Sequence, residues 1–400
     1  MRRIHRSDFM LIVGNCSARV QPRSLLAPRA SAQRHRQRAI EAAADGDARL
    51  PEHVSYRPSF NRELLMHVQL IREFGTPDVF EAAEIDTPTP GPGQLLVRQV
   101  ASSVNPVDTK LRTAGPPIAP ALPGVLGCDV AGIVEAVGDG VTRFTEGDAV
   151  YGCAGGLRGR GGAYGEYIAV DAELMATKPD TLDWRETAAL PLVTITAWEA
   201  MIDRCRVAPG DHVLIHGGAG GVGHIAIQLA KSQGARVAAT VSSAAKADIA
   251  RRMGADETIN YREEAVADYV ERLTGGRGFD VVFDATGGSD IATSFAGARV
   301  NGQVATIVSQ YEADLTPMHG KSLTLHVIFM LTSMLNGTHP QHHGEILAKA
   351  AGLAAAGQLK PLLDERRFNL DDIAAAHSHL EAGAAIGKIV IDIGDEARNA

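Results

Sequence analysis

The sequence has no apolar run long enough to cross a membrane. Its longest apolar stretches, such as Phe9 to Val13, cover only a few residues, whereas a membrane-spanning helix needs about 20. Cysteine is also scarce, with four in 400 residues and neither a CxxC pair nor zinc-finger spacing. A disulfide framework is therefore excluded, and a reducing compartment is expected.

Basic residues are few outside the N-terminal segment. Residues 1–64 carry twelve Arg, no Lys and six acids, so the net charge of −8 conceals a still more acidic remainder. An acidic body repels both nucleic acid and anionic lipid. We therefore expect no membrane partner and no nucleic-acid partner.

Residues 1–65 differ from the rest of the chain. They are rich in Arg, poor in acids near the start and without sustained helical periodicity, and Met66 then opens a cleanly alternating strand. This composition fits either a disordered extension, including one from a start codon assigned too early, or an organelle transit peptide. A cytoplasmic location is expected, with a mitochondrial one as the alternative if the segment is a transit peptide.

Residues 66–188 have the pattern of a small β-barrel. Short alternating segments at Gln94 to Val100, Val130 to Val137 and Tyr164 to Val170 are separated by turns rich in Pro and Gly. Such spacing predicts strands joined by tight turns.

Residues 189–330 alternate between strand and helix. Strands are predicted at 212–216, 236–241, 281–284 and 303–308, with helices at 225–233 and 246–254. Repeated βα units predict a parallel, doubly wound sheet, so the fold class is α/β. Residues 331–394 are expected to return to the first domain, and residues 395–400 to form a tail.

A glycine-rich loop follows the first of these strands. The sequence His216-Gly-Gly-Ala-Gly-Gly-Val-Gly223 satisfies GxGxxG at a joint between strand and helix. Glycine allows a backbone to approach a pyrophosphate closely, and a helix beginning near Val222 would point its free N–H groups at the phosphates. We therefore predict a dinucleotide site formed by Gly218, Ala219, Gly220, Gly221, Val222 and Gly223.

An acidic residue is missing where an NAD enzyme would place one. That residue would lie about 20 positions after the loop and bind the ribose hydroxyls. Here the stretch from Thr240 to Lys246 has no acid and offers Ser242, Ser243 and Lys246. Hydroxyl and ammonium groups suit a 2′-phosphate, so NADPH is favoured over NADH, unless Lys246 is only a solvated residue of the next helix.

These residues resemble the medium-chain dehydrogenase/reductase superfamily, and within it the zinc-free quinone oxidoreductase branch that includes zeta-crystallin. The matching motifs cover the chain from about Met66 to Ile393. In order they are Asn105-Pro-Val-Asp108, Pro123 to Val134, Gly147 to Gly152, Gly162 to Tyr167, Leu190-Pro-Leu192 with Thr196-Ala-Trp198, the glycine loop, Phe279 to Asp284 and Gly387-Lys-Ile-Val-Ile391. The resemblance implies a GroES-like substrate domain, a Rossmann cofactor domain and a homodimer.

The resemblance also points to missing zinc ligands. Zinc alcohol dehydrogenases of this superfamily have a Cys near the position of Asn105 and a His in place of Cys128. A catalytic zinc needs three protein ligands, and Cys128 and Asp129 alone do not supply them. We therefore expect no metal, and with no Lewis acid the reduction of a conjugated acceptor is favoured over alcohol oxidation.

The expected reaction is hydride transfer from NADPH to a quinone or an enone. By resemblance, Asn105 and Asp108 line the substrate cleft, while Lys110 and Tyr164 are further candidates for charge stabilisation or proton donation. Alternatively, Asn105 sets a turn, Asp108 caps it and Tyr164 is a strand residue. By resemblance, Thr196 would contact the nicotinamide end of the cofactor and Tyr261 would lie beside Lys246. Val308 is a further predicted cofactor contact.

Two other functions remain open at this stage. One is an NADPH-binding sensor or structural protein with little catalysis, and the other is a zinc-type alcohol dehydrogenase. The loop Gly155-Gly-Leu-Arg-Gly-Arg-Gly-Gly162 is interpreted as a rim over the cleft, with an RNA-binding segment as the alternative.

Overall fold

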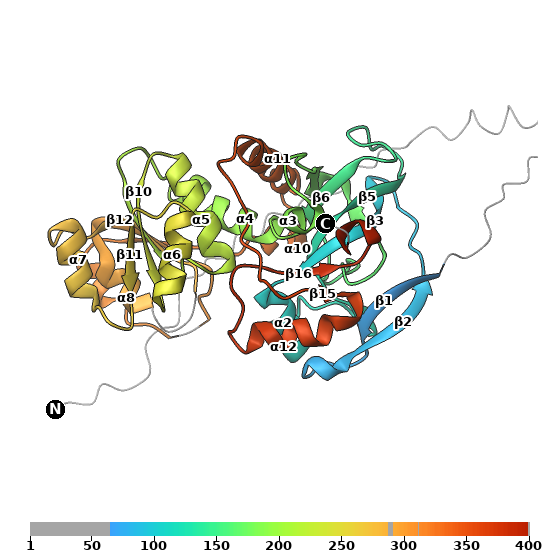
Figure 1. Ribbon diagram of the computed structural model, residues 1–400, viewed down its shortest axis with the longest axis horizontal. Coiled ribbons are helices and arrows are strands. Elements are labelled where there is room, and N and C mark those ends of the chain that lie inside the picture. The colour runs from blue at the N-terminus through green and yellow to red at the C-terminus, as the bar shows by residue number, and fades with distance from the viewer. Residues whose placement is uncertain (1–64, 287–290, 311, 399–400) are drawn as a thin grey trace, which may run out of the picture. The chain divides into compact units, whose positions relative to one another are not determined.

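The computed structural model describes residues 65–286, 291–310 and 312–398 (Figure 1). The predictions made for residues 1–64 therefore lie outside the described residues. Within the described part, no helix is both long enough and apolar enough to cross a membrane.

Two sheets form the β-rich domain, and all their strand pairs are antiparallel except the parallel pair of β15 and β16. The smaller sheet has the order β2 (Phe80–Asp86), β1 (Leu65–Ile71), β4 (Gly124–Val125). The larger has the order β15 (Phe368–Asn369), β16 (Ile389–Asp392), β3 (Gln94–Val104), β5 (Asp129–Val137), β6 (Ala149–Cys153), β8 (Met175–Thr177), and β7 (Tyr167–Asp171) also pairs with β3. β15 and β16 come from near the end of the chain, and β16 pairs with β3 from near its start.

A six-stranded parallel sheet forms the cofactor-type domain. Its order is β11 (Glu257–Asn260), β10 (Arg236–Val241), β9 (His212–His216), β12 (Phe279–Asp284), β13 (Ala298–Thr306), β14 (Thr324–Val327). Counted from β9, this is the 3-2-1-4-5-6 order of the doubly wound fold. The order reverses direction between β9 and β12, and that is where such folds bind their ligands.

Helices cover both faces of this sheet because its central strand is apolar on both sides. Val213 and Ile215 belong to the core that includes α5 (Gly221–Ser232) and α6 (Ala244–Arg252), whereas Leu214 belongs to the core that includes α7 (Val266–Thr274) and α8 (Ile291–Gly297). Alternate residues of a strand point to opposite faces, so an uninterrupted apolar strand buries both.

The remaining helices connect the two domains or pack on their sheets. They are α2 (Pro106–Ala114), α3 (Trp184–Ala188), α4 (Pro191–Trp198), α9 (Thr316–Gly320), α10 (Leu331–Asn336), α11 (Gln341–Ala355), α12 (Ile373–Glu381) and α13 (Asp395–Arg398). A π-helical segment at Glu199–Arg204 continues α4, and single 3-10 turns lie at Pro77–Val79, Ala172–Leu174 and Leu370–Asp372.

Two of the local expectations that differ from the structure have a clear physical cause. The strand predicted from Tyr164 begins at Tyr167, because the side-chain amide of Gln99 donates to the carbonyls of Ala163 and Gly165 at 2.9 and 2.7 Å. The predicted tail contains α13, where Ala397 is buried and Glu396 pairs with Arg98 at 3.0 Å. The alternation of polar and apolar residues does not reveal a side-chain hydrogen bond or the burial of a single Ala, so neither difference could be predicted from it.

Removal of residues 1–64 should leave a folded, fully active protein. β1 begins at Leu65, and both of its partner strands lie within the described residues. Truncation outside paired strands costs little stability. The thermal midpoint of the truncated protein should match that of the full chain, and insoluble or unfolded truncated protein would contradict this expectation.

Candidate active site

The glycine loop joins β9 to α5, as predicted. A Cβ at Gly223 would lie 2.1 Å from the carbonyl oxygen of Gly217, so only glycine fits there. Gly220 is exposed, has an extended backbone and is the N-cap of α5. The free N–H groups of the first turn therefore open toward solvent at the carboxyl edge of the sheet, which suits an anion.

The residues predicted to bind the 2′-phosphate come together at the same edge. β10 pairs with β11 in the register Val241 to Asn260, so Ser242 and Tyr261 each directly follow one of two neighbouring strand ends. Tyr261 is 56% exposed. Ser243 caps α6 and accepts a hydrogen bond from the backbone N–H of Lys246 at 3.3 Å, which places Lys246 in the first turn of α6.

The other two predicted cofactor residues, Val308 and Thr196, lie in different parts of the structure. Val308 follows β13, and its N–H donates to the hydroxyl of Thr306 at 3.3 Å. It therefore lies at the same carboxyl edge as the glycine loop, on the β12 side of the point where the strand order reverses. Thr196 is a buried residue of α4, and its hydroxyl donates to the carbonyl of Leu192 at 2.7 Å.

Asn105 lies in a fully buried polar cluster. Its amide nitrogen donates to the Asp129 carboxylate at 2.8 Å, and its amide oxygen accepts from the ammonium of Lys388. Lys388 also lies 3.1 Å from the carbonyl of Val104 and 3.4 Å from Asp129, while Ser103 donates to Asp129 at 2.5 Å. The buried carboxylate is thus satisfied by an ion pair and hydrogen bonds, as burial requires.

Lys388 connects this cluster to the glycine loop. The N–H of Gly387 donates to the carbonyl of Ala219 at 3.2 Å, and Gly387 forms a parallel bridge with Gly220. A Cβ at Gly221 would lie 3.3 Å from Cδ of Lys388. The Lys388 side chain therefore runs from the glycine loop to Asn105.

Asp108 and Tyr164 form a second buried group with His377. The Asp108 carboxylate accepts from the backbone N–H of Asn105 at 2.8 Å, from the Tyr164 hydroxyl at 3.3 Å and from the Cys128 thiol at 3.3 Å. Burial raises the pKa of Asp108 to about 6 and the pKa of Tyr164 well above its usual range. The hydrogen bond with Cys153 and, to a smaller extent, burial raise the pKa of the Cys128 thiol.

The hydrogen bonds around His377 assign its tautomer. Arg112, which is only 1% exposed and can only donate, lies 3.4 Å from Nδ1, so Nδ1 accepts and carries no proton. Nε2 then carries the proton and donates to the Tyr164 oxygen at 3.2 Å. Arg112 itself pairs with Glu381 at 2.5 Å, so the donors run in one direction from Arg112 to Asp108.

His377 should make the protein sensitive to acid. Burial lowers the pKa of His377 from 6.5 to about 3. Above pH 6.5 the ring is neutral in both folded and unfolded chains, and as the pH falls toward 3 only the unfolded chain binds the proton. The free energy of unfolding should then fall by up to about 1.4 kcal/mol per pH unit from this one group.

The measurement is urea unfolding of the wild type and of His377→Gln between pH 7 and pH 5. The variant should have the shallower pH dependence, and His319→Gln, which alters an exposed histidine, should keep the wild-type slope. Equal slopes for the wild type and His377→Gln would show that His377 titrates normally.

The four predicted catalytic residues are thus only partly assembled. Asn105, Asp108 and Tyr164 lie in the two buried groups, and both groups involve the start of α2. Lys110 is exposed on α2 and belongs to neither group. Sequence reasoning assigned no role to Lys388 or His377, although Lys388 lies in the quoted motif at 387–391.

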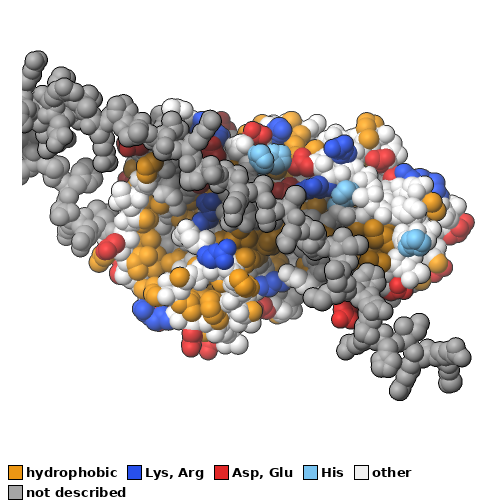
Figure 2. Space-filling view, turned by 180° about the vertical axis from the view of Figure 1, so that it is seen from behind, with side chains coloured by type: hydrophobic (Ala, Val, Ile, Leu, Met, Phe, Trp, Pro, Cys, Tyr) orange, Lys and Arg blue, Asp and Glu red, His pale blue; other side chains and the backbone are white. Residues whose placement is uncertain are grey.

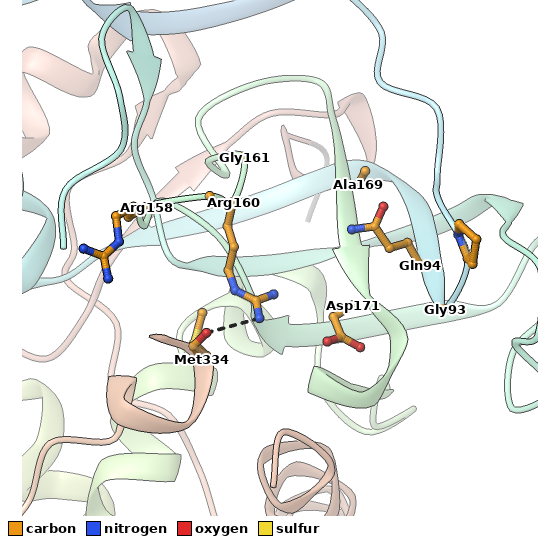
Figure 3. A pocket seen from close by; sticks show the side chains of 10 residues that line it. Gly93, Gln94, Arg158, Arg160, Gly161, Ala169, Asp171 and Met334 are labelled. Atoms are coloured by element: carbon orange, nitrogen blue, oxygen red, sulfur yellow. Dashed lines mark hydrogen bonds between the residues drawn. The ribbon is translucent and has the colours of Figure 1, made fainter. Parts of the chain in front are cut away.

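The Gly- and Arg-rich loop is hydrogen-bonded to neighbouring segments and lines a pocket (Figure 3). Arg160 donates to the carbonyl of Met334 in α10 at 3.3 Å, and Arg158 donates to the carbonyl of Pro117 at 3.0 Å. The loop lines a pocket of about 540 Å³ together with Gln94 and Asp171.

Figure 2 shows basic side chains as separate spots among acidic ones on one face of the protein, not as one basic patch.

The described residues do not fit a catalytic zinc. Among them, no group of three or more His, Cys, Asp or Glu side chains is arranged to hold a metal ion. Asn105 is hydrogen-bonded to Lys388, and the positive charge of Lys388 would repel a divalent cation beside Asp129. Cys128, Cys153 and Cys205 are free, buried thiols.

Two family models match the chain. The model described as "Alcohol dehydrogenase GroES-like domain" matches residues 91–180, and the model described as "Zinc-binding dehydrogenase" matches residues 253–391. The first falls in the barrel domain. The second covers the later strands of the parallel sheet and the return segment.

The chain is similar to named proteins along nearly all of its described length. It is 29% identical to a human quinone oxidoreductase over 82% of this chain and 98% of that protein. It is 35% identical to a tomato 2-methylene-furan-3-one reductase over 80% of this chain and 77% of that protein. The crystal structure of Escherichia coli quinone oxidoreductase complexed with NADPH has a TM-score of 0.74 at 29% identity, and covers 82% of this chain and 99% of that one.

Proposed function

Because the chain belongs to the medium-chain dehydrogenase/reductase superfamily, in its quinone oxidoreductase branch, we propose that it reduces a quinone or an α,β-unsaturated carbonyl compound with NADPH and without zinc. The membership itself makes it an oxidoreductase. The cofactor, the metal-free chemistry and the acceptor class are the proposed parts.

The observation that carries the proposal is the position of Lys388. One end of this residue lies against the glycine loop, and its ammonium is hydrogen-bonded to Asn105 and paired with Asp129. A fixed positive charge therefore occupies the buried cluster next to the cofactor loop. This arrangement favours anionic groups nearby and disfavours a divalent metal ion.

NADPH is the proposed cofactor because of the residues after β10. Ser242, Ser243 and Lys246 supply two hydroxyls and an ammonium at the strand end, and Tyr261 is exposed beside them. The first turn of α5 would hold the pyrophosphate. Bound NADPH would supply the hydride. A crystal structure of a relative described as complexed with NADPH supports this choice.

The acceptor is proposed to be a conjugated carbonyl compound. Reduction of an enone adds hydride to the β-carbon and a proton to the α-carbon, and conjugation spreads the incoming charge onto the oxygen without a Lewis acid. The names of the human and tomato relatives specify a quinone and an unsaturated ketone. Both are substrates of this kind.

The buried residues are proposed to support the acceptor site rather than to touch the acceptor. Asn105, Asp108 and Tyr164 are each 0% exposed, and together with Lys388 they hold the start of α2 in place. Lys110 is exposed on that helix, so it or water is the proposed proton source.

The test is product analysis with a simple enone and NADPH. The saturated ketone is the expected product, because hydride should reach the β-carbon. An allylic alcohol as the main product would contradict the proposed acceptor chemistry. Tight NADPH binding without turnover of any quinone or enone would favour a binding protein instead.

A further inference from the structure

His224 lies one helical turn after Gly220 on α5 and is completely buried. It directly follows the last glycine of the GxGxxG motif, and the dinucleotide prediction assigned it no role. Its ring is enclosed between the glycine loop and the segment at residues 360–362, which precedes β15.

Both ring nitrogens of His224 have defined partners. Nε2 accepts a hydrogen bond from the backbone N–H of Leu362 at 3.0 Å. Because a backbone N–H only donates, Nε2 carries no proton, and the proton is on Nδ1. Nδ1 then donates to the carbonyl oxygen of Gly220 at 2.9 Å. Burial lowers the pKa of His224 to about 4, so this neutral tautomer persists at neutral pH.

The carbonyl of Gly220 is therefore held by two donors from one residue. It accepts from the backbone N–H of His224 at 3.1 Å as well as from the ring. A trans peptide is planar, with its C=O and N–H pointing in opposite directions. Holding the Gly220 carbonyl along α5 thus directs the N–H of Gly221 out of the N-terminus of the helix, where a pyrophosphate would approach.

Gln228 lies one turn further along α5 and also binds the 360–362 segment. It therefore allows the effect of holding this segment to be distinguished from the effect of holding the Gly220 carbonyl. Its amide accepts from the backbone N–H of Lys360 at 2.8 Å and donates to the carbonyl of Lys360 at 2.9 Å. Gln228 therefore holds the 360–362 segment by two hydrogen bonds, and within the described residues its side chain makes no hydrogen bond to the glycine loop. Among the described side chains, His224 is the one with a hydrogen bond to the Gly220 carbonyl.

We infer that His224 is a positioning residue that fixes the Gly220–Gly221 peptide for the pyrophosphate of the cofactor. This inference rests on the proposed function, since it takes the glycine loop to be the NADPH site. The ring acts through the backbone of the loop and does not touch the cofactor.

Two substitutions separate the two bonds of the ring. In His224→Asn the amide nitrogen reaches the place of Nδ1, so the donor to Gly220 is kept and the acceptor for Leu362 is lost. In His224→Gln the amide oxygen reaches the place of Nε2, so the acceptor is kept and the donor is lost. Gln228→Leu is the matched control, because it frees the 360–362 segment and leaves the loop unchanged.

The experiment compares the binding of NADPH with that of 2′-AMP, which has no pyrophosphate. His224→Gln should raise the Kd for NADPH about five- to tenfold, the effect of one hydrogen bond, whereas His224→Asn and Gln228→Leu should stay near the wild-type value. The Kd for 2′-AMP should be unchanged in all three variants.

Several results would overturn the inference. These are equal losses of NADPH affinity in the Asn and Gln variants, an unchanged Kd for NADPH in His224→Gln, or a parallel loss of 2′-AMP binding. Failure of the wild-type protein to bind NADPH would instead overturn the proposed function. The two failures are thus distinguished by the wild-type titration.

Discussion

Replacement of Gly220 by Val should abolish NADPH binding without unfolding the protein. Gly220 has φ −87° and ψ 173°, an extended conformation that β-branched residues adopt readily. Its Cβ would lie 3.2 Å from the carbonyl oxygen of Gly217, a tight contact that a small shift relieves. The added isopropyl group would stand over the first-turn N–H groups of α5, so the Kd for NADPH should rise by at least about 100-fold.

Binding of NADPH and the thermal midpoint are measured together for this variant. Gly352→Val is the matched control, because a Cβ at Gly352 meets open space on α11, and it should bind NADPH normally. Gly223→Ala should instead unfold or destabilise the loop, since its Cβ lies 2.1 Å from the Gly217 oxygen. Normal NADPH affinity in Gly220→Val would mean that the cofactor does not approach this loop.

Removal of the Lys246 side chain should change cofactor selectivity. Lys246 is in the first turn of α6, and its backbone is fixed by Ser243. Its ammonium is proposed to pair with a 2′-phosphate, which only NADPH carries. Lys246→Ala should therefore raise the KM for NADPH about 10- to 100-fold, the range for a charged hydrogen bond, and leave the KM for NADH unchanged.

The control for this effect is Arg252→Ala, which removes an exposed positive charge from the other end of α6. It should change neither KM by more than about twofold, because exposed charges at a distance are screened. A similar rise in the KM for NADPH and the KM for NADH in Lys246→Ala would show that this residue does not recognise the 2′-phosphate.

The cofactor domain was predictable because its signals are local. The strands at His212–His216 and Arg236–Val241 agree with the sequence pattern at both ends. The glycine spacing also located the joint between β9 and α5. The strand Glu257–Asn260 was not predicted from its pattern, so the position of Tyr261 near Lys246 followed only from the family resemblance.

The buried clusters were not predictable because their bonds join distant parts of the chain. Lys388 is 283 residues from Asn105, and His377 is 213 residues from Tyr164. Neither pairing leaves a local spacing pattern. Asn105 and Asp108 could be found because they lie within one motif at the start of a helix, but the motif does not show that both are fully buried.

The most direct test of the central claim is NADPH oxidation by chelator-treated wild-type protein. Benzoquinone, phenanthrenequinone and a simple enone serve as acceptors, NADH is run in parallel, and bound metal is measured on the same sample. Turnover that prefers NADPH in protein free of metal is the predicted result. Turnover that disappears with the metal and returns when zinc is added would contradict the assignment of Lys388 and Asn105 to a metal-free site.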